Sequence, residues 1–101
     1  MTTDGYHTTF SFQPDHPSLP GHFPARPLVA GVLLLEQVAD ALRAWRGERL
    51  AGVREAKFIA PLQPGQAAQL RLTPSGAQVR FEIRREGELL ARGMVEGAAD
   101  A

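Results

Sequence analysis

The chain of 101 residues has no cysteine, no net charge and no long apolar run. Without cysteine it can form no disulfide and use no thiolate chemistry, which fits a reducing compartment. Equal numbers of basic and acidic side chains give no general attraction to nucleic acid or to a membrane surface. No segment approaches the ~20 apolar residues of a membrane span, and the N-terminus lacks the basic and apolar regions of a signal peptide. We therefore expect a cytoplasmic globular protein.

Length and patterning predict one α+β domain over residues 1–101, with loose ends at 1–5 and 97–101. Strands are indicated by alternating apolar and polar residues, most clearly where charged residues separate Val79, Phe81 and Ile83. Glu86-Gly87 predicts a hairpin turn. His7 falls on the polar side of the first strand, as a solvated histidine would. The expected strands are 6–13, 53–62, 67–73, 78–85 and 88–95.

One helix is predicted from Gly31 to about Trp45, with Gly47 just past its end. Its first half is apolar almost all round, so we expect the sheet to enclose it. Ala30-Gly31 provides no side-chain cap, which leaves the first N–H groups open to a ligand oxygen. The residues expected on its apolar face are Val32, Leu35, Val38, Ala39 and Leu42.

Residues 14–30 hold most of the chain's eight prolines and predict a stiff, irregular loop. His22 lies in this loop, directly after the turn-forming pair Pro20-Gly21. An imidazole held in place is a natural proton acceptor at neutral pH. For this residue taken alone, a histidine that bonds only to backbone is the simpler interpretation.

Glu36 follows Val-Leu-Leu-Leu early in the predicted helix. Burial there would favour the protonated carboxyl, which would let it serve as an acid, and Asp40 one turn on would act in the same direction. A surface glutamate whose apolar neighbours point elsewhere is an equal alternative. A metal site is not expected, because no recognised spacing joins the candidate ligands His7, Asp15, His16, His22 and Glu36.

Residues 21–36 read Gly-His-Phe-Pro-x-Arg-Pro-x-x-x-Gly-Val-Leu-x-x-Glu. They resemble the active-site segment of the hot-dog-fold β-hydroxyacyl-ACP dehydratases. The resemblance is specific across residues 16 to 42, and a looser one runs from Val53 to Glu96. The resemblance implies a five-stranded antiparallel sheet wrapped around one long central helix. It also implies that His22 is the catalytic base, Glu36 the catalytic acid and the Gly31 N–H a ligand of the thioester carbonyl. The other implied substrate-binding residues are Phe23, Pro24 and Val32.

The activity that this resemblance implies is dehydration of a 3-hydroxyacyl thioester to a trans-2-enoyl thioester, without metal or redox cofactor, in fatty-acid-like or polyene biosynthesis. The substrate arrives on the phosphopantetheine arm of acyl carrier protein. In the family, His22 of one chain of a homodimer faces Glu36 of the other. The short chain looks more like dehydratase-like members of specialised pathways, such as aryl polyene synthesis. Ala25, Ala30 and Asp40 depart from the family pattern, and Asp40 changes the surroundings of Glu36.

Basic residues are frequent between positions 43 and 57, where a carrier can dock. Acyl carrier proteins are acidic, and the residues that we expect to contact one are Arg26, Arg43 and Arg46, near Arg49, Arg54 and Lys57. Ordinary solvated surface gives the same pattern. Two rival classes remain. The joint presence of His22 and Glu36 argues against a hot-dog thioesterase, and a non-catalytic acyl-binding subunit would more typically lack one of them.

Overall fold

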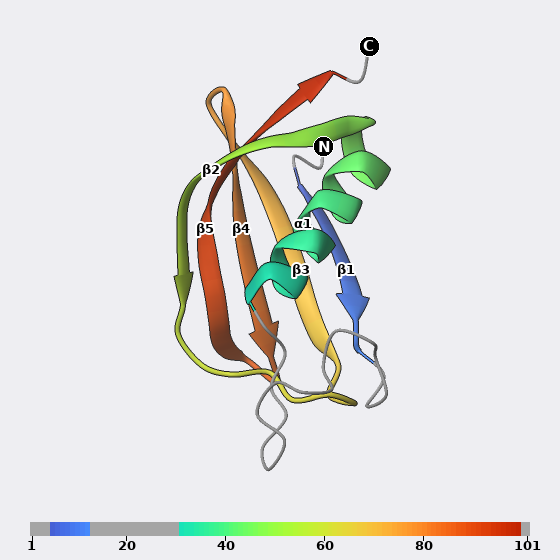
Figure 1. Ribbon diagram of the computed structural model, residues 1–101, viewed down its shortest axis with the longest axis vertical. Coiled ribbons are helices and arrows are strands. Elements are labelled where there is room, and N and C mark those ends of the chain that lie inside the picture. The colour runs from blue at the N-terminus through green and yellow to red at the C-terminus, as the bar shows by residue number, and fades with distance from the viewer. Residues whose placement is uncertain (1–4, 13–30, 100–101) are drawn as a thin grey trace.

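The computed structural model describes residues 5–12 and 31–99, which form five strands and one helix (Figure 1). The sheet is antiparallel throughout, with the order β1-β3-β4-β5-β2, so β1 and β2 lie at its two edges. This confirms the predicted α+β class with five antiparallel strands and one long helix. The elements are β1 (Tyr6–Phe10), α1 (Gly31–Arg46), β2 (Glu48–Phe58), β3 (Ala68–Ser75), β4 (Gln78–Arg85) and β5 (Glu88–Ala99).

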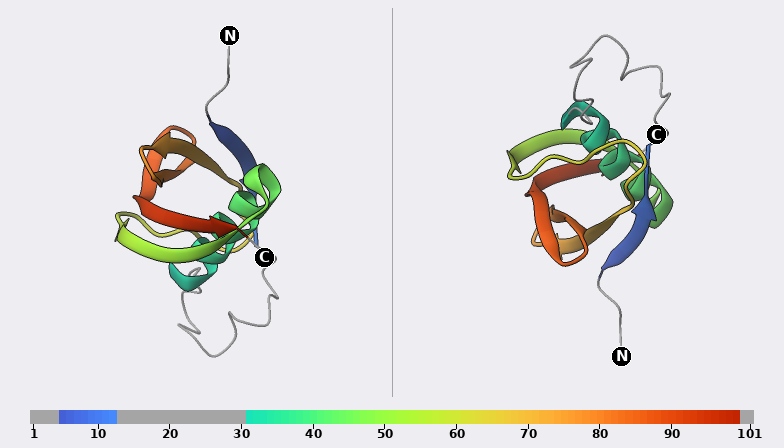
Figure 2. Two further views of the ribbon diagram at one scale, coloured as in Figure 1. Left: turned by 90° about the horizontal axis from the view of Figure 1, so that it is seen from above. Right: turned by 90° about the horizontal axis from the view of Figure 1, so that it is seen from below.

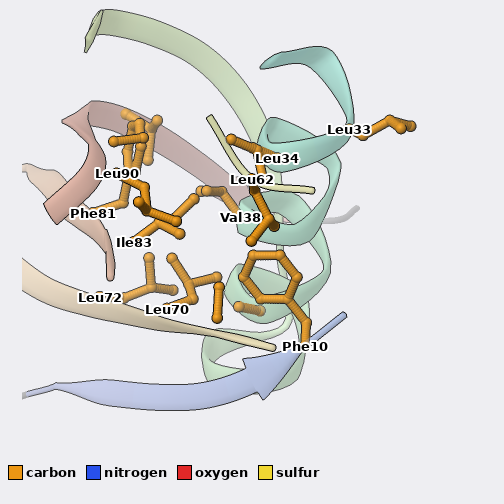
Figure 3. Packing of buried hydrophobic residues seen from close by; sticks show 14 of the residues in the cluster. Phe10, Leu33, Leu34, Val38, Leu62, Leu70, Leu72, Phe81, Ile83 and Leu90 are labelled. Atoms are coloured by element: carbon orange, nitrogen blue, oxygen red, sulfur yellow. The ribbon is translucent and has the colours of Figure 1, made fainter. Parts of the chain in front are cut away.

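Viewed end on, the sheet is strongly curved, and α1 lies on its open side between the two edge strands (Figure 2). The helix packs against β2, β1 and β3. Leu34 and Val38 point from the helix toward Leu62 and the apolar side chains of the sheet (Figure 3). Within residues 5–12 and 31–99, no polar or charged residue is buried in this core. No helix of this part of the chain is long and apolar enough to cross a membrane.

The helix turns a different face to the sheet from the one expected. Val38 and Leu42 are buried as predicted, but Val32 is 63% exposed. Leu34 and Ala41 are buried instead, and they lie on the same face of the helix as Val38 and Leu42. Because the first helical turns are apolar on several sides, periodicity alone did not select the buried face. One stripe of the helix, which includes Val32, stays exposed in the single chain.

Strand β2 begins earlier than predicted, directly after the helix. Gly47 has φ 68° and donates its N–H to the Arg43 carbonyl at 2.8 Å, so the predicted helix end is confirmed. The chain then enters β2 at Glu48 and leaves it at Phe58, whereas residues 53–62 were expected. Beyond β2, the N–H of Ile59 donates to the Leu90 carbonyl at 2.7 Å.

The expectation of a loose end at 97–101 is wrong for Gly97–Ala99, which continue β5 and pair with the first residues of β2. Residues 1–4 and 100–101 lie outside the described ranges. The predicted strand 6–13 is shorter, because Ser11 and Phe12 are not in a strand and position 13 is not described. β3 runs to Ser75, two residues further than expected. The strand 78–85 is confirmed, and so is the hairpin turn, where Glu86 and Gly87 have φ 50° and 85°.

Candidate active site

Gly31 begins α1, as predicted, and lies against the ring of Phe58 at the end of β2. A Cβ atom on Gly31 would lie 2.9 Å from Phe58 Cζ and 3.1 and 3.2 Å from its two Cε atoms. These distances are shorter than ordinary carbon–carbon contacts of about 3.5–4.0 Å. Glycine is therefore the residue that lets the phenyl ring reach the backbone at the start of the helix. No acidic residue occupies the first turn.

An apolar hollow of about 200 Å³ opens beside this contact. Its walls suit a short hydrocarbon segment, and the first N–H groups of a helix suit a carbonyl or enolate oxygen. Complete small-molecule sites usually measure about 300–1,000 Å³, so the described residues form only part of such a site. The hollow is lined by Gly31, Leu34, Phe58, Ile59, Ala60, Pro61 and Leu62.

Glu36 is exposed on the side of α1 that faces away from the core. It lies one turn after Val32, and the exposed stripe continues to Asp40. Within the described ranges, no hydrogen bond or ion pair joins the Glu36 carboxylate to another residue. The expectation that Glu36 is buried is therefore wrong for the single chain. Glu36 is instead a surface glutamate, because apolar neighbours such as Leu34 turn toward the core while Glu36 does not.

Four of the predicted site residues, namely His22, Phe23, Pro24 and Arg26, lie outside the described residues, as do the candidate metal ligands Asp15 and His16. Among the residues that are described, no three His, Cys, Asp or Glu side chains gather at one point. His7 lies on the outer surface of β1, where it is exposed as predicted, while Glu36 lies on the helix that covers the inner surface. The structure thus keeps these two candidate ligands apart.

The basic residues between positions 43 and 57 lie in the last turn of α1 and along β2. Arg43 and Arg46 lie in the last turn of α1, about 18 and 22 Å from Gly31 along the helix axis. The Arg46 guanidinium lies 4.0 Å from the centroid of the Trp45 ring. Lys57 instead adjoins Phe58 at the other end of the helix. Arg49 and Arg54 are exposed along β2 between these positions.

Phe58 and Ile59 are the site residues that the sequence interpretation missed. Both line the hollow, and both are about half exposed, at 50% and 54%. The available signal was an apolar pair that follows the charged Lys57 where β2 ends. Such a pair can lie in a core or on a surface that binds a partner. The sequence does not distinguish these cases, whereas the packing of Phe58 on Gly31 in the structure does.

An antiparallel sheet curved around one helix, with an apolar hollow at the helix start, defines a hot-dog protein, and solved structures share this fold. The dehydratase heterocomplex ApeI:P from Xenorhabdus doucetiae matches with a TM-score of 0.83 and 21% identity, over 96% of this chain and 89% of the other. An acyl-CoA hydrolase from Staphylococcus aureus matches with a TM-score of 0.69 and 17% identity, over 97% and 64% of the two chains. At these identities the likeness concerns the fold.

Sequence comparison identifies the family within this class. Residues 2–94 match the ApeI-like family model, described as ApeI dehydratase. The 3-hydroxyacyl-[acyl-carrier-protein] dehydratase FabZ of Halorhodospira halophila is 36% identical over 95 residues, which cover 82% of this chain and 59% of the relative. The chain belongs to the ApeI-like dehydratase family, so the predicted resemblance is confirmed. It spans about half the length of the curated relatives that it matches, for example 45% of the FabZ of Histophilus somni.

Proposed function

We propose that the protein removes water from a 3-hydroxyacyl thioester carried on acyl carrier protein and produces a trans-2-enoyl thioester. The observation that carries this proposal is the apolar hollow at the start of α1, where the Gly31 backbone lines a space suited to an acyl thioester. Family membership supports the reaction class, because the family model and its FabZ relatives bear the names of dehydratases. A cytoplasmic location fits a carrier-dependent reaction of this kind.

The proposed mechanism uses three groups of the chain. His22 removes the proton from the carbon next to the thioester carbonyl, and the electron pair moves toward the carbonyl oxygen. The Gly31 N–H and the positive end of the helix dipole stabilise that oxygen as negative charge develops on it. Glu36 protonates the hydroxyl group, and the electron pair of the enolate forms the new carbon–carbon double bond as the carbon–oxygen bond breaks and water leaves. Since the steps are redox-neutral, no electron carrier is consumed.

A second chain completes the proposed site. The described residues of one chain present Glu36 on an exposed helix stripe and form only a small cavity of about 200 Å³. The exposed apolar residues Val32, Val53, Phe58 and Ile59 lie on this stripe and along or just beyond β2, which is an edge strand. An edge strand and exposed apolar side chains together favour association with another chain. We therefore propose a homodimer in which His22 of one protomer faces Glu36 of its partner.

Docking of the acidic carrier is assigned to Arg26, Arg43 and Arg46, of which the last two lie in the final turn of α1. This contact is exposed and electrostatic, so carrier binding should weaken as added salt shortens the Debye length from about 30 Å at 0.01 M to about 8 Å at 0.15 M. Carrier binding that does not change between low and high salt would contradict this assignment.

The experiment is mass spectrometry of 3-hydroxyacyl carriers of several chain lengths after incubation with the protein. The parent protein should convert at least one carrier to the species lacking one water. His22→Ala and Glu36→Gln should each lower the rate by roughly 10²–10⁴-fold. Glu88→Gln, which removes an exposed carboxylate in β5, is the matched control and should keep the parent rate. Parent-level dehydration by folded His22→Ala and Glu36→Gln variants would contradict the mechanism.

The same assay separates the two alternative functions. A hot-dog thioesterase would release the free acid and leave the carrier without its acyl group. A non-catalytic acyl-binding subunit would leave every carrier unchanged. Either result for the parent protein would refute the proposed dehydration.

A further inference from the structure

A second hollow lies on the outer face of the sheet, away from α1. Its volume is about 410 Å³, and strands β1, β3 and β4 form it. It shares no residue with the hollow at the helix start. The lining residues are His7, Thr9, Gln69, Leu70, Arg71, Glu82 and Arg84.

The strand register places the polar lining residues in two neighbouring rows. In the first row His7 lies opposite Arg71, and Arg71 lies opposite Glu82. In the second row Thr9 lies opposite Gln69, and Gln69 lies opposite Arg84. Side chains directly opposite each other on one face have Cβ atoms about 4.5–5.5 Å apart. The rows therefore bring donors from three strands within reach of one small ligand.

The charges in these rows are only partly compensated. Glu82 Oε1 lies 3.6 Å from Arg84 Nη2, and Arg84 Nη1 donates to the Gly87 carbonyl at 3.4 Å. These contacts engage Glu82 with Arg84. The Arg71 guanidinium makes no ion pair or hydrogen bond within the described ranges. The hollow thus holds two guanidinium groups and one carboxylate, which leaves it a net positive charge even when His7 is neutral.

We infer that this hollow binds a small ligand that carries phosphate groups. Arginine offers a planar fork of donors that suits phosphate oxygens, and the Thr9 hydroxyl and the Gln69 amide add neutral donors beside it. The volume lies within the usual range of about 300–1,000 Å³ for small-molecule sites. The hollow includes β1, at the opposite sheet edge from β2, so the dimer proposed above leaves it open. The inference does not depend on the dehydratase function.

Binding is tested by isothermal titration of the full chain with inorganic pyrophosphate at low ionic strength. The parent protein should bind saturably, and Arg71→Gln should weaken binding roughly tenfold or more, because a charge-assisted hydrogen bond is lost. The matched control is Arg80→Gln. Arg80 is exposed on the same face and likewise makes no ion pair in the described part of the chain, but it does not line this hollow. Its variant should bind within about twofold of the parent.

Two results would overturn the inference. The first is absence of saturable binding by the parent, and the second is an equal loss in both variants, which would indicate diffuse attraction to the whole face. Backbone amide NMR shifts during the titration locate the ligand independently. They should change at His7, Thr9 and Arg71, whereas changes confined to Gly31 and the next residues would place the anion at the helix start and refute this site. Thermal melts of both variants should match the parent, since Arg71 and Arg80 are exposed.

Discussion

Gly31→Ala tests the contact on which the candidate site is built. The added methyl would lie 2.9–3.2 Å from three carbons of the Phe58 ring. Ordinary contact requires about 3.5–4.0 Å, so the ring must retreat by roughly 0.5–1 Å. Phe58 is 50% exposed and the atoms concerned are the free end of its side chain, so this retreat is possible without moving the backbone.

The expected effect on stability is small, because two changes of similar size oppose each other. Overpacking costs about 1–3 kcal/mol and should be at the low end beside an exposed ring. Alanine in place of glycine gains at most about 1 kcal/mol in a helix. The free energy of unfolding should therefore stay within about 1 kcal/mol of the parent value. Catalysis should suffer more, since a displacement of about 1 Å in a site can cost roughly 10²-fold in rate.

The assay combines thermal denaturation with the rate of enoyl formation. Gly31→Ala is compared with Phe58→Ala and with the double variant, because removing the ring should abolish most of the penalty of the added methyl. Gly52→Ala is the control, since its Cβ would meet only Glu96 Oε1 at 3.6 Å. The reasoning fails if Gly31→Ala keeps the parent kcat/KM, or if its effect is the same whether or not the Phe58 ring is present.

Three further predictions concern single positions. Leu34→Ala should lower the free energy of unfolding by about 2–5 kcal/mol, because Leu34 is buried. Val32→Ala should lower it by less than about 1 kcal/mol, because Val32 is exposed, and should weaken self-association instead. Denaturant titration measures the first effect and sedimentation the second. Gly93→Ala should destabilise by about 3 kcal/mol or more, because its Cβ would meet the β2 backbone and the Phe81 ring, and a near-parental melt would refute this. Glu36→Gln should change stability by no more than about 0.5 kcal/mol, so a large shift in its melt would show that Glu36 is structural.

The parts of the fold that sequence predicts best are those set by neighbouring residues. β4 is one such part, because Val79, Phe81 and Ile83 are buried and the residues between them are not. The hairpin after it follows from the positive φ that Gly87 accepts. The start of β2 depends instead on its pairing with Gly97–Ala99, about fifty residues away along the chain. Local pattern does not contain that information.

The candidate site shows the same division. Gly31 at the helix start is predictable, because a missing cap and a glycine can be read directly from the sequence. The exposure of Val32 and Glu36 is not, since it depends on which helix face meets the sheet. Apolar neighbours suggested burial for Glu36, yet in one chain those neighbours turn inward. In the proposed homodimer, the second chain would enclose Glu36.

The most direct test of a shared dehydratase site is to mix the His22→Ala and Glu36→Gln variants. Each variant alone should be nearly inactive. If His22 of one protomer acts with Glu36 of its partner, subunit exchange forms mixed dimers that contain one intact site. Random pairing at equal amounts should then restore roughly one quarter of the parent dehydration rate. If the mixture stays as inactive as its components while exchange is shown to occur, the shared site is refuted.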